Sequence, residues 1–68
     1  MNAREMFESL GYGCHKPDEK IEYSRSVEYI IFRVNEHEFY AGYCNEPKDI
    51  TMDEFKAIQQ QLKELGWI

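Results

Sequence analysis

The sequence predicts a single α+β domain in the order helix–strand–strand–strand–helix, with both helices packed on one face of a three-stranded antiparallel meander. Three observations predict this fold. Apolar residues recur at helical spacing near both ends of the chain, the middle is rich in β-branched and aromatic residues with strand alternation, and turn-forming residues separate these segments. A three-stranded sheet needs a helical cover to be stable. At 68 residues, we expect residues 1–68 to be one domain.

The first helix is predicted from Asn2 to Leu10. Asn2 suits the N-cap position, and Glu5 stands three residues on, where its carboxylate can accept a bond from the cap's own N–H. Gly11 is the expected left-handed residue that ends the helix, and Tyr12 can pack back on the last turn. The spacing places four apolar residues on one face: Ala3, Met6, Phe7 and Leu10.

The last helix has the clearest start in the chain. Thr51 to Glu54 form a capping box, and Ile50 before the cap can pack on Phe55 as a hydrophobic staple. Gly66 is expected to end the helix, with the following residue, Trp67, folding back. The predicted inward stripe consists of Phe55, Ile58, Leu62 and Leu65.

Three strands are predicted between the helices, at 20–24, 27–34 and 37–43. The second is apolar on both faces in its later half, which is typical of a central strand. Tight turns are expected at Arg25-Ser26 and Asn35-Glu36. Residues 13–19 and 44–49 are predicted to be loops, because Gly13, Pro17 and Pro47 interrupt regular structure.

A two-residue turn at Asn35-Glu36 fixes the register of the second and third strands. The resulting cross-strand pairs are all favourable: Arg33 with Glu38, Phe32 with Phe39, Ile31 with Tyr40, and Ile30 with Ala41. One face is then predicted to be the core, with Ile30, Phe32, Phe39, Ala41 and Tyr43. The other carries Tyr29, Ile31 and Tyr40, surrounded by Arg33, Glu38 and Glu22.

The charge disfavours two classes of partner. Thirteen acidic residues against eight basic ones give a net charge of -5, and the basic residues are scattered singly. Binding to nucleic acid or anionic lipid relies on clustered Lys and Arg. No apolar leader and no apolar run of membrane-spanning length is seen. We therefore expect a cytoplasmic chain with no membrane partner and with reduced thiols.

The residues that could carry chemistry do not form a recognisable site. Cys14, His15, His37 and Cys44 lack the paired spacing of a zinc site. The same residues could supply a Cys–His nucleophile pair, but so short a chain can scarcely enclose the pocket that catalysis needs. The many carboxylates are expected at the surface, with Asp53 and Glu54 at a helix N-terminus, where negative charge is favourable. We expect no enzyme activity, no metal and no cofactor.

The segment from Ile50 to Ile58, continuing to Glu64-Leu65-Gly66-Trp67, resembles the C-terminal helix of small uncharacterised proteins of phages and prophages of Gram-positive bacteria. Residues 3–8, Leu10-Gly11-Tyr12 and the Tyr-, Ile- and Phe-rich middle are also similar. The resemblance covers most of the chain, mainly through caps and core positions. It implies a phage or prophage origin and a cytoplasmic setting, and it carries no activity or site residues.

The best functional lead is the sheet face that the helices do not reach. Exposed aromatic and apolar residues grouped on one face mark partner surfaces. We therefore expect a protein-interaction surface on this face or on the edge of the sheet, for a partner protein or for a second copy of the chain. Its expected residues are Tyr29, Ile31, Tyr40, Arg33 and Glu38. Two alternatives stay open: a nucleic-acid-related module that stacks bases on the aromatic face, and an acidic inhibitor that mimics DNA.

Overall fold

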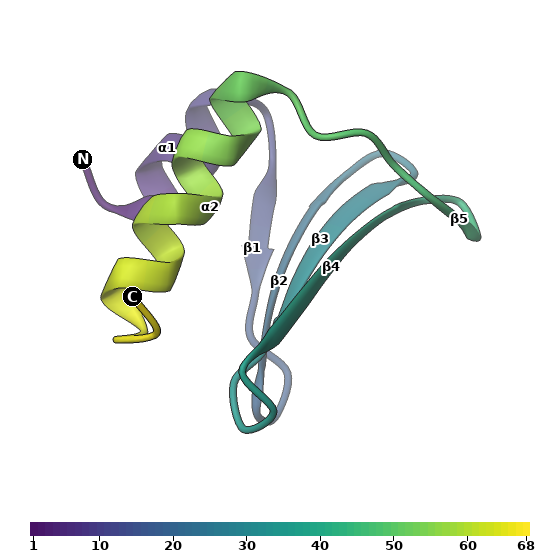
Figure 1. Ribbon diagram of the computed structural model, residues 1–68. Helices are drawn as coiled ribbons and strands as arrows, with labels where there is room; N and C mark the ends of the chain where they lie inside the picture. Colours follow the sequence, from purple (N-terminus) through teal and green to yellow (C-terminus); the bar gives the residue numbers. More distant parts are fainter.

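The computed structural model describes residues 1–68 as one α+β unit. Five strands form a single antiparallel sheet in the order β1-β2-β3-β4-β5. Both helices lie on one face of this sheet, which bends away from them toward the β4–β5 end (Figure 1). The elements are α1 Ala3–Ser9, β1 Gly13–His15, β2 Lys20–Arg25, β3 Glu28–Arg33, β4 Glu38–Tyr43, β5 Glu46–Pro47 and α2 Met52–Glu64.

The predicted three-stranded meander is correct for β2, β3 and β4 but misses two edge strands. β1 comes from the segment predicted as loop 13–19, and β5 from the predicted loop 44–49. Each pairs on one side only, β1 with β2 and β5 with β4. An edge strand tolerates Gly and Pro because half of its backbone groups need no partner in the sheet. Pairing with a neighbouring strand, which local propensity does not reveal, creates both strands.

The turn between β2 and β3 lies one residue later than predicted. Arg25 remains in the strand and pairs with Glu28, so the turn residues are Ser26 and Val27. Ser26 adopts a left-handed φ of 55°. The Arg25 guanidinium holds the strand end, with Nε 3.0 Å from Glu28 Oε2 and Nη1 2.6 Å from the Leu10 carbonyl oxygen. The β3–β4 register agrees with the prediction at all four pairs. The turn is longer than the predicted Asn35-Glu36, because strand pairing ends at Arg33 and Glu38 and His37 adopts a left-handed φ of 57°.

The ends of α1 are confirmed. The Asn2 side chain accepts a bond from the Glu5 N–H, and the Glu5 carboxylate accepts one from the Asn2 N–H. Gly11 has a φ of 93°, and the Tyr12 N–H donates to the Phe7 carbonyl at 3.0 Å. The Tyr12 ring meets the Phe7 ring edge-on. These bonds satisfy backbone groups that a helix end leaves without intrahelical partners.

The ends of α2 follow the same chemistry. Thr51 and Glu54 form the predicted capping box. Gly66 has a φ of 76°, and the Trp67 N–H donates to the Leu62 carbonyl at 2.9 Å. No helix combines the length and apolar character needed to cross a membrane.

The core lies between the helices and the β2–β3 part of the sheet. Phe7 of α1 stacks on Tyr23 of β2 with ring centroids 3.9 Å apart, and Phe32 of β3 meets both rings edge-on. The Tyr23 hydroxyl donates to Gln61 Oε1 of α2 at 2.6 Å, which satisfies two buried polar groups. The buried apolar set is Ala3, Phe7, Tyr12, Tyr23, Ile30, Phe32, Ala57 and Ile58.

The prediction that Phe39, Tyr43 and Phe55 are core residues is wrong. Their exposed fractions are 44%, 52% and 48%. A helix is about 10 Å wide and strands lie about 4.8 Å apart, so two helices cover about four strands at most. Because α1 packs on β1 and the far end of the sheet bends away, the helix-side face of β4 stays partly open.

Candidate partner surface

The five residues predicted for a partner surface lie together on the helix-free face of the sheet. Arg33 is directly opposite Glu38, and Ile31 is opposite Tyr40, on the paired strands β3 and β4. Tyr29 is opposite Gly42, one position further along the same face. We call Tyr29, Ile31, Tyr40, Arg33 and Glu38 the second-face patch. Tyr29 and Ile31 are half-buried, whereas the other three are exposed.

The aromatic rings of the second-face patch are held by one another. The Tyr29 ring covers Gly42, whose missing side chain leaves room for it. The same ring meets Tyr40 edge-on, with centroids 6.1 Å apart, and the Arg33 guanidinium lies 5.1 Å above the Tyr40 centroid. Edge-on aromatic pairs and cation–π contacts each contribute about 0.5–1 kcal/mol at such sites. The patch is therefore ordered before any partner arrives.

The charges that flank the patch are mixed. Lys20 and Arg33 are opposite each other on β2 and β3, and Glu22 and Glu38 lie on the same face. A hollow at the Arg33 end is lined by Lys20, Arg33 and three further carboxylates, Asp18, Glu19 and Glu36. Carboxylates therefore outnumber the two cations at this end of the patch, which disfavours an acidic partner there.

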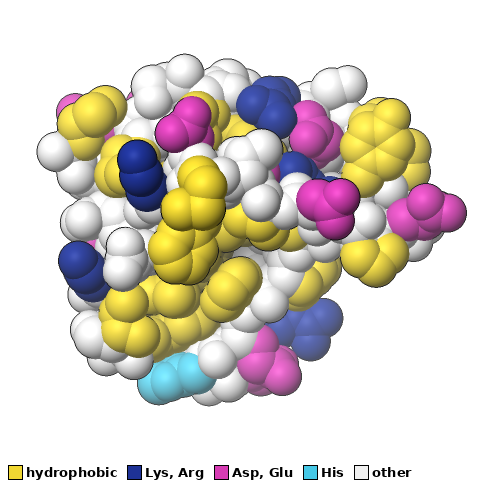
Figure 2. Space-filling view, turned by 45° about the horizontal axis from the view of Figure 1, so that its top comes forward, with side chains coloured by type: hydrophobic (Ala, Val, Ile, Leu, Met, Phe, Trp, Pro, Cys, Tyr) yellow, Lys and Arg dark blue, Asp and Glu magenta, His cyan; other side chains and the backbone are white.

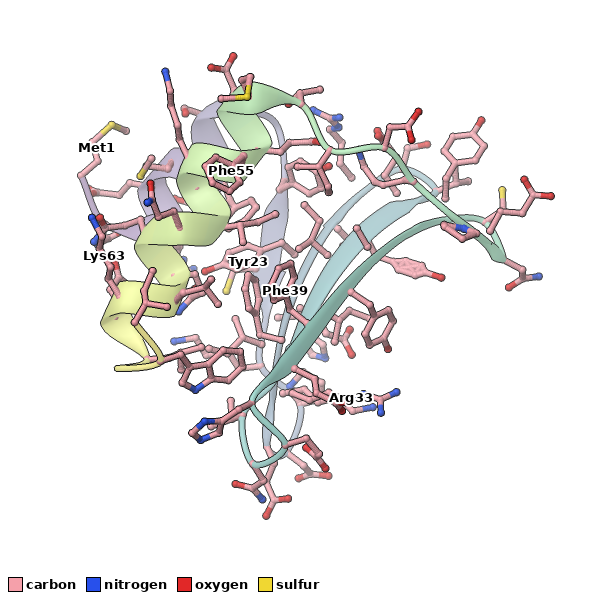
Figure 3. All side chains as sticks on the ribbon, in the orientation of Figure 1. Met1, Tyr23, Arg33, Phe39, Phe55 and Lys63 are labelled. Atoms are coloured by element: carbon pink, nitrogen blue, oxygen red, sulfur yellow. The ribbon has the colours of Figure 1, made fainter.

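A second exposed apolar surface was not predicted. Phe39 projects from β4 toward α2, and Phe55 lies on the surface of α2 (Figure 3); both rings are about half-exposed. Hydrophobic side chains form a continuous band on this side of the molecule (Figure 2). The sequence could have indicated this surface, because two helices are too narrow to cover a five-stranded sheet. That argument requires the number of strands, and β5 was not predicted. We call Phe39 and Phe55 the helix-side opening.

A buried charge cluster joins the two halves of the chain at the α2 N-terminus. Glu54 is 2% exposed. It accepts a 2.6 Å bond from the Tyr12 hydroxyl, bonds of 2.9 and 3.1 Å from Lys48 Nζ, and a 3.0 Å bond from the Thr51 N–H. Arg25 approaches the same carboxylate at 3.4 Å. The expectation of a solvated Glu54 is wrong, although its role in the helix cap is confirmed.

The protonation of this cluster follows from its bonds. Burial raises the pKa of the Glu54 carboxyl, but the hydrogen bonds from Tyr12, Lys48 and Thr51 lower it by more, to about 2. Burial and the bond to Glu54 raise the pKa of the Tyr12 hydroxyl above its usual range. Both groups therefore keep one protonation state across neutral pH. Every buried side-chain polar atom has a partner, so the cluster presents no unpaired group to a ligand.

The cysteines and histidines do not come together. Cys14 is half-buried in β1, Cys44 is exposed in the turn between β4 and β5, and both thiols are free. His37 stacks on Trp67 with ring centroids 5.1 Å apart. No three His, Cys, Asp or Glu side chains are placed to hold a metal ion.

Comparison with known proteins adds no relative: no protein family, curated protein or solved structure matches this chain.

Proposed function

We propose that this chain is a non-enzymatic accessory protein that binds another protein through the second-face patch. The observation that carries the proposal is the ladder of Tyr29, Tyr40 and Arg33, left uncovered on a face that neither helix reaches. A phage or prophage setting is part of the same proposal and rests on the sequence resemblance described above.

The side chains of the second-face patch are already held in place, which favours binding. Immobilising a flexible side chain at an interface costs about 0.5–1.5 kcal/mol. The Tyr29 ring already lies on Gly42 and against Tyr40, and Tyr40 lies beneath Arg33. A partner therefore meets rings that have little freedom left to lose. Tyr and Arg are also the residue types that contribute most to binding energy at interfaces.

The charge pattern indicates the chemistry of the partner. The second-face patch has an apolar centre with Arg33 and Glu38 at one end, and Lys20 and Glu22 beside it on β2. Its complement is a flat protein surface with an apolar centre and charges of both signs at the rim.

Base stacking is the second candidate, because Tyr40 beneath Arg33 has the composition of a platform for single-stranded nucleic acid. The net charge of -5 opposes it, since such binding depends on a positive groove. The two candidates make different predictions about salt. Nucleic-acid binding weakens steeply as salt rises, whereas a protein contact centred on apolar and aromatic side chains changes less.

The test uses Tyr40→Ser and a matched control, Tyr43→Ser. Both tyrosines are exposed on β4, but Tyr43 points to the helix side of the sheet. Proteins captured by the chain from a Gram-positive host are identified, purified and titrated against both variants by calorimetry. We expect Tyr40→Ser to weaken binding at least tenfold, a loss of about 1.4 kcal/mol, and Tyr43→Ser to leave it unchanged.

Two results would contradict the proposal. One is a purified partner that binds Tyr40→Ser as tightly as the natural chain. The other is salt-dependent binding of single-stranded oligonucleotides that Tyr40→Ser abolishes, which supports the base-stacking candidate instead.

A further inference from the structure

Strand β4 has an open outer edge over part of its length. β5 pairs with β4 at Gly42 and Tyr43 only, and the Lys48 N–H extends this contact with a long 3.4 Å bond to the Ala41 carbonyl. Beyond Lys48 the chain leaves the sheet to begin α2. Residues 38–40 of β4 therefore have β3 on one side and no strand on the other.

The open stretch has one residue whose backbone faces outward. The N–H and C=O of a strand residue point to the same edge, and the edge alternates from one residue to the next. Since the Ala41 carbonyl points toward β5, the N–H and C=O of Phe39, two residues earlier, point to the same outer edge. No strand lies there to pair with them. Phe39 thus presents one free donor and one free acceptor.

The helix-side opening lies beside this free position. The Phe39 ring stacks on Phe32 at 5.6 Å and is 44% exposed, and Phe55 of α2 is 48% exposed. Phe39 lies between β4 and α2, and Phe55 lies over the α2 ribbon (Figure 3). An unpaired strand edge next to exposed aromatic rings is a template for pairing with another strand.

We infer that a second copy of this chain occupies this edge, with its own β4 antiparallel to β4 and a two-fold axis between the two Phe39 residues. The open stretch is centred on Phe39, which is the one position where such an axis gives two reciprocal N–H to C=O bonds. The two five-stranded sheets become one continuous sheet. The Phe39 rings of the two copies meet on the helix side, with a Phe55 ring near each.

The charges of the edge permit this pairing. An axis at Phe39 places Glu38 of one copy opposite Tyr40 of the other and keeps the two Glu38 side chains from facing each other. An axis at Glu38 would place two carboxylates opposite each other. An axis at Tyr40 would present backbone groups that already point toward β3. Charge and hydrogen-bond direction therefore select the same register.

The size of the contact predicts a weak dimer. A buried aromatic side chain covers about 150–250 Å², so two half-exposed rings offer roughly 200 Å² per copy. Stable complexes bury about 800 Å² per partner. Each copy also carries a charge of -5, so salt should strengthen the dimer by screening the repulsion. This inference does not depend on the proposed function, because it rests on the free backbone groups of Phe39 and on the Phe39 and Phe55 rings; of the second-face patch, only Glu38 and Tyr40 border the joint.

Sedimentation equilibrium from low micromolar to millimolar concentration, at low and high salt, tests the inference. We expect the natural chain to pass from monomer to dimer, with the transition at lower concentration in high salt. Phe39→Pro removes the outward N–H, and Pro is tolerated at an edge where that group has no partner in the sheet. Phe55→Lys places a charge in the opening from a half-exposed helix position. Each variant should raise the dissociation constant at least tenfold.

Two controls make the result specific. Met52→Lys introduces the same charge at another exposed position of α2 and should leave the dissociation constant within about twofold after correction for net charge. Thermal unfolding at micromolar concentration verifies that each variant is folded. If Phe39→Pro does not fold, Phe55→Lys alone tests the dimer contact. A natural chain that stays monomeric at millimolar concentration overturns the inference. So does a dimer that Tyr29→Ser, on the inner strand β3, dissociates and that Phe55→Lys leaves intact.

Discussion

At the scale of single residues, Glu54 is the side chain with the most partners. Its carboxylate closes the α2 capping box and also receives bonds from Tyr12 and Lys48. The Lys48 side chain is only 8% exposed, and its ammonium lies 2.9 Å from Glu54 and 3.4 Å from Glu28. A buried ion pair gives little net stability compared with apolar residues, but removing one member leaves the other uncompensated.

Glu54→Gln should therefore destabilise the protein by about 2–3 kcal/mol, because it removes the nearer counter-charge of the buried Lys48 ammonium and leaves only Glu28, at 3.4 Å. Urea unfolding followed by tryptophan fluorescence measures this loss. Asp53→Asn removes a charge from the neighbouring exposed position and should cost no more than about 0.5 kcal/mol. Equal effects of the two substitutions would show that Glu54 acts only through the helix dipole.

Gly42 is the second residue whose role can be tested alone. A Cβ at this position would overlap the Tyr29 ring, whereas a Cβ at Gly13 meets its nearest heavy atom, the Ser24 carbonyl oxygen, at 3.9 Å. Gly42→Ala should cost about 1–3 kcal/mol by overpacking, and Gly13→Ala should be close to neutral. If the Tyr29 ring is the cause, Gly42→Ala should cost much less in a Tyr29→Ala background. Additive effects in that double-mutant cycle would contradict this explanation.

At the scale of elements, the two helix starts use the same capping box in different surroundings. The Asn2 and Glu5 bonds are exposed, whereas those of Thr51 and Glu54 are partly buried. Replacing an N-cap residue by Ala costs about 0.5–2 kcal/mol. The loss of stability should be near the upper end of this range for Thr51→Ala and near the lower end for Asn2→Ala. Thermal unfolding measures both losses. The reverse order would mean that burial does not strengthen the cap.

The elements that could be predicted from the sequence are those with local signals. Both helices have readable ends at Gly11, Thr51 and Gly66, and the β3–β4 register follows from the Asn35-Glu36 turn. β1 and β5 could not be predicted, because two or three residues containing Gly or Pro form a strand only when a neighbouring strand supplies the pairing.

Only part of the candidate surface could be predicted from the sequence. The second-face patch follows from strict alternation along β3 and β4, so its five residues share a face as predicted. The exposure of Phe39 and Phe55 depends on how far two helices reach across five strands. The burial of Glu54 depends on Tyr12 and Lys48 meeting in space. These are properties of the assembled layers, which local pattern does not contain.

At the scale of the whole molecule, Glu54 makes stability depend on acid pH. Its pKa is about 2 when folded and about 4.5 ordinarily, so the unfolded chain binds the proton more readily. The stabilisation is complete above about pH 4.5 and is lost as pH falls toward 2, with a total on the order of 3 kcal/mol.

Unfolding free energies measured between pH 6 and pH 2 check this dependence. We expect them to fall through that window in the natural chain and to fall much less in Glu54→Gln, which has no carboxyl to titrate. If Glu54→Gln loses as much stability between pH 6 and pH 2 as the natural chain does, the acid dependence comes from other carboxylates.

The contacts of α2 also constrain when the chain can fold. Glu54 neutralises Lys48 and contacts Arg25, Gln61 bonds the Tyr23 hydroxyl, and Glu64 accepts a 2.7 Å bond from the Ala3 N–H. During synthesis the strands leave the ribosome before any of these partners exists. Until α2 packs, Lys48 and Arg25 have only Glu28 as a counter-charge, the Tyr23 hydroxyl lacks its acceptor, and the apolar helix-side face of the sheet is open to water. The native structure therefore forms only after α2 has emerged, so protection by a chaperone would be needed most during that interval.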